Sequence, residues 1–405
     1  MATKATKTTK KPSKKPAISK PVLIGGVAVL LAVIAVIIIF SCRSSKSPDA
    51  SADDPALAAP VALMAASKDS KWGFVDMEGL WAITPVYEDV KPFEKNRLAA
   101  VKKDGVWGFV DENGTEVIPP YYEEVLSFSN GLAAVSDQGR WGFINESGMN
   151  VIPSIYEFAG SFSANGLARV QQNGQFGFVD STGALRIPIS FDAAFAFDEY
   201  GYAAVSVGDR WGFIDETGTY LIQPQYDAVG TCFRHNMAAV KTDSGWGYID
   251  STGNLVIQPQ FHYAGDFSQE GIARVMVAGQ YSYINTSGNF ITETTFQDCK
   301  DFSGGLALVT VNKQQALLKA DGTFAAAAGG NTYPGSLDTS PFLYKSPEGL
   351  YGYMDSTGAV VVAAQYTNAQ PFRISGYAAV CKDGLWGILD QSGNVVLDFQ
   401  YESMK

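Results

Sequence analysis

Few residues in this chain have the types and spacing that a catalytic or metal site requires. The 405 residues contain two histidines, His235 and His262, and neither belongs to a cluster of cysteines or carboxylates in the sequence. Structural and catalytic zinc sites need three or four such ligands, so we expect no metal and no cofactor. The sequence also contains no phosphate-binding Gly-Lys-Ser/Thr run and no Gly-x-Ser-x-Gly nucleophile motif. We therefore assign no catalytic, metal-binding or cofactor-binding residue.

Carboxylates are plentiful, but they recur in one short motif, Asp/Asn-x-x-Gly. The copies begin at Asp76, Asp111, Asn145, Asp180, Asp215, Asp250, Asn285, Asp355 and Asp390. An Asx residue at the first position of a turn bonds the backbone two residues on, and glycine at the fourth accepts a left-handed conformation. A calcium loop needs more oxygen ligands than one such turn offers. A pair of carboxylates acting on a glycan is an open alternative, although catalytic pairs are usually singular and these acids recur.

The recurrence reflects a repeat of about 35 residues, marked by a Trp-Gly pair or an aromatic equivalent. We interpret the aromatic residue as the structural anchor of each unit, because Trp buries a large apolar surface. The glycine lets a neighbouring backbone approach, or supplies a β-bulge. The anchors are Trp72, Trp107, Trp141, Phe176, Trp211, Trp246, Tyr281, Tyr351 and Trp386.

Each unit has the pattern of a three-stranded meander with a short fourth element. A Leu-Ala-Ala-Val strand leads through an Asp-Gly or Asn-Gly turn into the Trp strand, and an Asx-x-x-Gly turn leads into a Val-Ile-x-Pro strand. We expect pairing to end at the proline, which has no N–H to donate. Ten such units over 61–405, the eighth degenerate at about 314–345, predict an all-β tandem repeat array. We favour an open twisted stack, with a closed β-propeller as the alternative.

The N-terminal region predicts a membrane anchor. Residues 1–21 form a basic tail that we expect to be disordered and cytoplasmic, and Val22 to Phe40 is a nineteen-residue apolar stretch long enough to span a bilayer as a helix. The positive-inside rule then places the N-terminus in the cytoplasm and the repeats outside. Residues 41–60 read as a flexible linker. The open alternatives are lipidation at Cys42 and cleavage of the segment.

The charge of the chain is divided unevenly. Nine of the 30 basic residues lie within residues 1–48, which hold no acidic residue, so 21 basic residues accompany 41 acidic ones in the remainder. Such a surface repels nucleic acid and favours neutral or cationic partners, and it also keeps the protein soluble. Cys232, Cys299 and Cys381 occupy different places in different units, which predicts no disulfide framework.

These motifs resemble the WG-containing repeat family of bacterial proteins. The match rests on Lys-Trp-Gly-Phe-Val-Asp at 71–76, on Gly-Trp-Gly-Tyr-Ile-Asp at 245–250, and on the Val-Ile-x-Pro and Gly-Leu-Ala segments that follow. The resemblance implies a β-repeat array without enzymatic activity, used for interactions. We therefore expect a membrane-anchored scaffold on the bacterial cell surface that binds an envelope protein or polysaccharide. The alternatives are an envelope glycan hydrolase and a purely structural spacer.

Overall fold

The computed structural model describes residues 63–326, 330–373 and 375–405. The predicted tail (1–21), membrane helix (22–40) and linker (41–60) lie outside these residues. Among the residues that are described, no helix is both long enough and apolar enough to cross a membrane.

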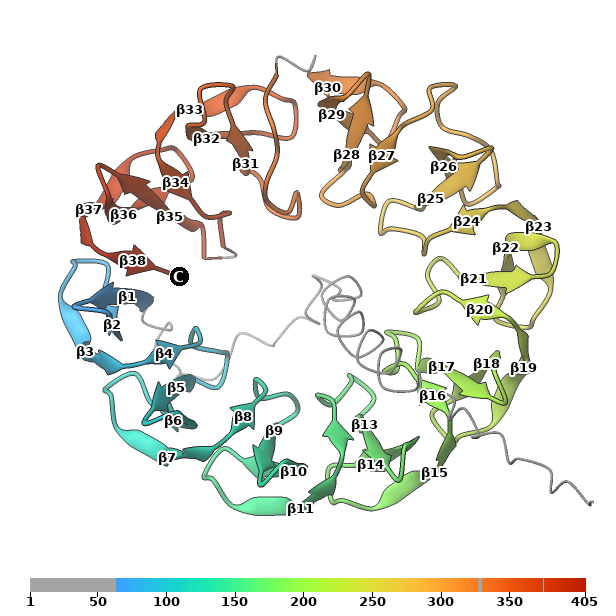
Figure 1. Cartoon of the computed structure of the whole chain (residues 1–405), viewed down its shortest axis with the longest axis horizontal. Coiled ribbons are helices and arrows are strands. Elements are labelled where there is room, and N and C mark those ends of the chain that lie inside the picture. The colour runs from blue at the N-terminus through green and yellow to red at the C-terminus, as the bar shows by residue number, and fades with distance from the viewer. Residues whose placement is uncertain (1–62, 327–329, 374) are drawn as a thin grey trace, which may run out of the picture. The chain divides into compact units, whose positions relative to one another are not determined.

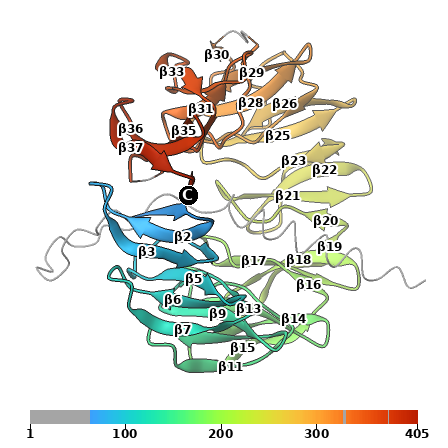
Figure 2. The same cartoon turned by 60° about the vertical axis from the view of Figure 1, so that its left-hand side comes forward.

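The described chain folds into ten antiparallel sheets arranged in a ring (Figure 1). Each sheet is one blade, and its strands follow one another from the centre of the ring outward. Blade 1 contains β38 and β1–β3; the others are β4–β7, β8–β11, β12–β15, β16–β19, β20–β23, β24–β26, β27–β30, β31–β33 and β34–β37. Turned by 60°, the ring shows its blades stacked side by side (Figure 2). The predicted all-β repeat is confirmed, and it takes the closed-propeller alternative rather than the open stack.

The four strand positions of a blade have distinct lengths and places. The innermost strands are β4 (Asp89–Val90), β8 (Glu124–Val125), β12 (Phe158–Ala159), β16 (Ala193–Ala194), β20 (Ala228–Val229), β24 (Tyr263–Ala264), β27 (Asp298–Cys299), β34 (Asn368–Ala369) and β38 (Ser403–Met404). The second strands are β1 (Met64–Lys68), β5 (Ala99–Lys103), β9 (Leu132–Asp137), β13 (Leu167–Gln172), β17 (Tyr202–Val207), β21 (Met237–Thr242), β25 (Ile272–Val277), β28 (Leu306–Val311), β31 (Phe342–Lys345) and β35 (Tyr377–Lys382).

The third strands carry the aromatic anchors, and the outer strands follow the Asx turns. The third strands are β2 (Lys71–Val75), β6 (Val106–Val110), β10 (Arg140–Asn145), β14 (Gln175–Asp180), β18 (Arg210–Asp215), β22 (Gly245–Asp250), β26 (Gln280–Asn285), β29 (Gln314–Lys319), β32 (Tyr351–Met354) and β36 (Leu385–Asp390). The outer strands are β3 (Trp81–Tyr87), β7 (Glu116–Tyr122), β11 (Asn150–Tyr156), β15 (Leu185–Phe191), β19 (Tyr220–Tyr226), β23 (Leu255–Phe261), β30 (Phe324–Ala326), β33 (Val360–Tyr366) and β37 (Val395–Tyr401).

The C-terminal strand closes the ring. β38 pairs with β1 through Ala66↔Met404 and Ser67↔Ser403, so the last residues supply the innermost strand of the first blade. The Tyr401 hydroxyl also donates a hydrogen bond of 2.9 Å to the Gly79 carbonyl. An open stack was the wrong expectation because the two terminal units need no caps: each buries the apolar face of the other.

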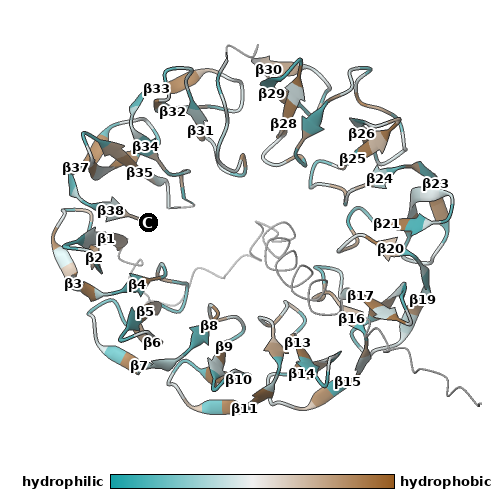
Figure 3. Ribbon diagram, in the orientation of Figure 1, coloured by the Kyte–Doolittle hydropathy of each residue, from teal (hydrophilic) through white to brown (hydrophobic). Residues whose placement is uncertain are grey.

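The hydrophobic cores lie between neighbouring blades. One core joins Trp107 and Phe109 of blade 2 to Val125 and Ala133 of blade 3, and the same arrangement recurs around the ring. Along the outer strands only the third and seventh residues are regularly buried, as in β7, and Figure 3 shows hydrophobic and hydrophilic segments alternating there. Within the described residues Cys232, Cys299 and Cys381 are buried, and no disulfide joins them to one another.

The Asx turns form as their residue types predict. In blade 2 the Asp111 carboxylate accepts hydrogen bonds from the N–H groups of Asn113 (2.9 Å) and Thr115 (2.8 Å). Gly114 closes the turn with a φ of 79°, a left-handed value that glycine adopts without strain. The turn therefore holds its carboxylate in a local structural role.

The expectation that pairing ends at the proline was wrong. β3 continues through Pro85 to Tyr87, which pairs with Trp72. The register shifts between the pairs Trp72↔Tyr87 and Phe74↔Ile83, so Pro85 lies in a β-bulge opposite Gly73. The two strands form no register pair there, so the missing N–H of the proline is not needed.

Blades 7 to 9 depart from the regular pattern. Among the described residues, blade 7 has three strands and lacks a regular outer strand, and blade 9 has three strands and lacks an innermost strand. The unit that the sequence marks as degenerate, at about 314–345, still pairs β29 with β28 along six residues and so completes blade 8. Its outer strand, β30, is the part that is shortened.

Candidate functional site

The nine aromatic anchors lie between the blades, and none of them is exposed. Trp107 and Trp386 are 6% and 9% exposed, and the other seven are half-buried. Trp386 of blade 10 packs in one core with Met64 and Met404 of blade 1. The structure therefore places the anchors at blade junctions.

Cationic side chains cover several of the anchors. Lys405 lies 4.2 Å from the centre of the Trp72 ring, and Lys91 lies 5.1 Å from that of Trp107. Arg274 lies over Tyr281 at 5.4 Å. A cation over an aromatic face stabilises the pair and shields the ring from solvent. These rings consequently offer little free surface to a ligand, and we looked for a site elsewhere.

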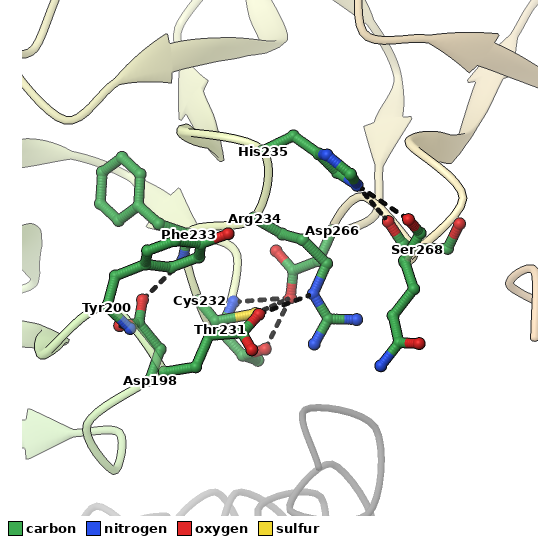
Figure 4. A network of polar contacts seen from close by, with 11 residues as sticks. Asp198, Tyr200, Thr231, Cys232, Phe233, Arg234, His235, Asp266 and Ser268 are labelled. Atoms are coloured by element: carbon green, nitrogen blue, oxygen red, sulfur yellow. Dashed lines mark hydrogen bonds and ion pairs between the residues drawn. The ribbon is translucent and has the colours of Figure 1, made fainter. Parts of the chain in front are cut away.

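The units differ most in the inner loops, which connect the innermost strand of each blade to the second strand. A phenylalanine at the centre of the loop packs into the core, as Phe197, Phe233 and Phe267 do. The residue after this phenylalanine is serine in several blades, for example Ser129 and Ser163. In blades 5 to 7 charged residues lie beside the phenylalanine, as Glu94, Asp301 and Arg373 do in blades 2, 8 and 10. We call Asp198, Arg234, His235, Asp266 and Ser268 the inner-rim cluster (Figure 4).

Asp198 ties the loop of blade 5 to the loop of blade 6. Its Oδ1 atom accepts hydrogen bonds of 2.9 Å from the N–H groups of Tyr200 and Tyr202. Its Oδ2 atom accepts one of 2.8 Å from the N–H of Phe233 in the next blade. Burial raises the pKa of the Asp198 carboxyl, and these three hydrogen bonds act in the opposite direction.

Asp266 makes the corresponding connection from blade 7 back to blade 6. Its Oδ2 atom accepts hydrogen bonds from the Thr231 N–H (2.9 Å) and the Thr231 hydroxyl (2.6 Å). Its Oδ1 atom is buried without a hydrogen bond, against Gly230, where a Cβ atom would lie 1.9 Å away. Glycine is therefore required at 230. Burial raises the pKa of Asp266, opposed by the Thr231 bonds and the nearby charge of Arg234.

Arg234 and His235 complete the cluster. The Arg234 side chain is buried, its Nε lies 3.7 Å from a Glu199 oxygen, and this Nε makes no hydrogen bond. His235 is exposed, and its Nε2 lies 3.0 Å from the Ser268 carbonyl oxygen, so Nε2 carries the proton that it donates. The Ser268 hydroxyl is buried without a partner.

The cluster thus contains buried, incompletely satisfied polar atoms beneath an exposed polar surface. Tyr200 is 50% exposed, and His235, Asn236 and Gln269 are also exposed. No group of three or more His, Cys, Asp or Glu residues that could hold a metal ion occurs within the described residues. His262 lies apart, exposed at the crossover from β23 to β24. The exposed side chains of this region can donate and accept hydrogen bonds, so the region is suited to binding a polar partner.

Sequence reasoning identified His235 but not Asp198, Arg234 or Asp266. A signal was present, because all three flank the loop phenylalanine at positions that hold serine in several other units. Aligning the units of this chain with one another reveals such departures from the repeat more clearly than a search for catalytic motifs does.

Comparisons with curated proteins and with solved structures give no strong likeness. No curated protein is similar to this sequence at a significant level. Among solved structures, a eukaryotic initiation factor is 12% identical, with 85% of this chain and 97% of that chain covered and a TM-score of 0.49. Hsv2p of Kluyveromyces lactis is 10% identical over 57% and 92% of the two chains, with a TM-score of 0.34. Likenesses at this level carry no argument about function.

The profile of the WG containing repeat matches nine segments of this chain. The segments are 72–107, 107–141, 141–175, 176–211, 211–245, 246–281, 281–314, 351–386 and 386–405. They begin or end at the aromatic anchors, and from residue 72 onward they leave out only 315–350, around the degenerate eighth unit. The chain is therefore a member of the WG containing repeat family.

Proposed function

We propose that the ring is a binding and scaffold module that engages a protein or polysaccharide partner through the inner loops of blades 5 to 7. The inner-rim cluster is the observation that carries the proposal. Buried charges cost free energy unless they are paired, and Asp198 and Arg234 occupy the position that holds serine in blades 3, 4, 7 and 8. The excess of acidic over basic residues after residue 48 favours a neutral or cationic partner.

The proposal includes a location. Val22 to Phe40 would anchor the chain in the cell membrane of a bacterium, with the N-terminus in the cytoplasm and the ring at the cell envelope. Protease added to intact spheroplasts should then digest the ring and spare the tail. Digestion of the ring only after lysis would contradict this location.

A binding role is favoured over a hydrolytic one because the two buried carboxyls of the cluster are engaged by the fold. Raised pKa values suit a general acid, yet Asp198 accepts three backbone hydrogen bonds and Asp266 is held by Thr231. Both accordingly serve to position the loops in our proposal.

The test compares two changes of exposed side chains in the full-length protein. Tyr200→Ala combined with His235→Ala removes the exposed part of the cluster, and Tyr121→Ala removes a tyrosine that is 58% exposed on β7 in blade 2. A glycan array and crosslinking to purified envelope proteins would measure binding. We expect at least a tenfold loss for the first variant and none for the second, since exposed hot-spot aromatics contribute over about 1.4 kcal/mol. Equal losses, or no ligand for the wild type, would contradict the proposal.

A further inference from the structure

The glycine of the Trp-Gly pair is covered directly by the outer strand of its own blade. At eight such glycines a Cβ atom would lie between 2.3 and 2.7 Å from the carbonyl oxygen of the outer-strand residue that packs there. In blade 6, for example, a Cβ at Gly247 would be 2.5 Å from the Ile257 oxygen and 2.7 Å from the Pro259 nitrogen. Any side chain at this position therefore pushes the outer strand away.

Blade 7 has a side chain there, because Ser282 occupies the place of the glycine. The ladder between β22 and β23 in blade 6 has three register pairs. In blade 7 the isolated bridges Tyr281↔Phe296 and Ile284↔Phe290 take the place of that ladder. Ile291 also donates a hydrogen bond of 3.0 Å to the Tyr283 carbonyl, and residues 292–295 belong to no strand. A side chain at 282 is in steric conflict with a regular outer strand, and Thr292 replaces the buried Ile257 that holds this strand in blade 6.

The displaced segment leaves a cavity on the outer wall of blade 7. Its volume is about 510 Å³, and its lining includes Val277, Gln280, Ser282, Phe290, Ile291 and Glu293. Ser282 as a whole residue is 4% exposed. Its hydroxyl makes no hydrogen bond to another of the described residues, and it is not among their fully buried polar atoms that lack a partner. Phe290 is 52% exposed and Val277 is 39% exposed. The cavity thus combines an apolar wall with one hydroxyl that is available for a hydrogen bond.

We propose that this cavity binds a small neutral molecule, an aromatic or short aliphatic compound with one hydrogen-bonding group that meets the Ser282 hydroxyl. Its volume falls in the range of about 300–1,000 Å³ that small-molecule sites occupy, and their lining is similarly apolar with few polar groups. A folded protein does not enter a space of this size. The Glu293 carboxylate in the lining disfavours an anion.

The proposal is tested with 2-naphthol, a bicyclic neutral probe, and hydrogen exchange of peptides covering 277–296 in the full-length protein. In the wild type, saturating 2-naphthol should slow exchange in these peptides at least threefold. Ser282→Gly lets residues 292–295 settle on β26, so its peptides should exchange slowly without the probe and show no further change. Ser190→Gly on β15 in blade 4 is the matched control and should behave as the wild type.

Ser282→Ala tests how much the Ser282 hydroxyl contributes to binding, separately from the shape of the cavity. This variant keeps the steric block, so it should still bind 2-naphthol, but about fivefold more weakly because one hydrogen bond is lost. Absence of any probe effect in the wild type would overturn the site. An equal effect in the wild type and in Ser282→Gly would overturn the role of Ser282.

Discussion

Blades 6 and 7 are neighbours built from the same repeat, and they differ at a few positions with large consequences. Blade 6 has Gly247 beneath a complete outer strand, whereas blade 7 has Ser282 and a displaced segment. The second, third and innermost strands of the two blades pair in the same way. The two blades therefore share the pairing of their inner three strands, while a regular outer strand is present only in the blade that has the glycine and the buried Ile257.

The two blades also differ in how they fill the space beside the aromatic anchor. Where the anchor is Trp246, the third residue of the second strand is Ala239; where it is Tyr281, that residue is Arg274. Arg274 stacks between the rings of Tyr263 and Tyr281, 5.2 and 5.4 Å from their centres. A guanidinium and a smaller ring thus replace an indole and a methyl group.

Blade 4 contains the same exchange of residue types. Phe176 is its anchor, and Arg169 lies over the rings of Phe158 and Phe176 at 5.0 and 5.4 Å. Phe158 and Tyr263 occupy the same place in the two innermost strands. The substitutions at Phe176 and Tyr281 are therefore each accommodated by a set of three residues.

The largest effect is expected from giving blade 6 the side chain of blade 7. Gly247→Ser places atoms within 3 Å of the β23 backbone, so β23 should detach and the free energy of unfolding should fall by about 3 kcal/mol. Urea unfolding and hydrogen exchange of residues 255–261 measure the two outcomes.

Gly160→Ser is the control for that change, because a Cβ at Gly160 would meet nothing closer than 3.7 Å. Its effect on the free energy of unfolding should stay within about 0.5 kcal/mol. If Gly247→Ser left β23 protected from exchange, the steric explanation of blade 7 would be wrong.

A smaller loss is expected from emptying the space beside the anchor in blade 7. Arg274→Ala removes both ring contacts, the hydrogen bond of 2.8 Å to the Cys299 carbonyl and the ion pair of 3.1 Å with Asp301. The free energy of unfolding should fall by about 2 kcal/mol, since the guanidinium is largely desolvated. Arg186→Ala, whose side chain is 62% exposed, should change it by less than about 0.5 kcal/mol. Similar values for the two variants would contradict this account.

The smallest expected effect concerns pH, because the Asx turn begins with Asp250 in blade 6 and with Asn285 in blade 7. Asp250 accepts hydrogen bonds from the hydroxyl of Thr252 (2.6 Å) and from the N–H groups of Thr252 and Asn254 (2.9 Å each). These bonds, the hydroxyl first, lower the pKa of Asp250 below its ordinary value of 3.8. Its stabilisation is therefore complete above that value and is lost as the pH falls through the lowered pKa.

Exchanging the two turn residues tests this predicted direction of the pH dependence of stability. Above about pH 5, the melting temperature of Asp250→Asn should lie about 1 °C below that of the wild type, and the difference should vanish in acid. Asn285→Asp should show the opposite difference over the same range. A difference that grew on acidification would mean that the carboxylate does not stabilise the turn.

The sequence alone was sufficient for the unit and its local geometry. The aromatic-Gly pair, the hairpin turns and the Asx turns are each local, so residues such as Gly247 and Asp111 reveal their backbone roles from type and spacing. The Ser282 departure was visible too. Its consequence was not, because the contact that it breaks becomes apparent only when the outer strand is seen over the glycine.

Closure and the inner-rim cluster were harder to predict for the same physical reason. Met404 and Ala66 pair across almost the whole chain, and nothing in the local pattern distinguishes a terminal unit from an internal one. Asp266 and Thr231 likewise meet only because two blades pack side by side. Contacts between units depend on the angle between blades, which the repeat period does not specify.

The seam at β38 has a consequence for how the protein is made. During synthesis nine sheets can assemble while the first still lacks its inner edge, because β38 is translated after all of the other described strands. A tag or fusion joined directly after Lys405 would press on the junction between the first and last blades. Loss or gain of a single unit by recombination would change the angle between every pair of neighbouring blades, because the ring must still close. The number of units is therefore constrained far more tightly than in an array with free ends.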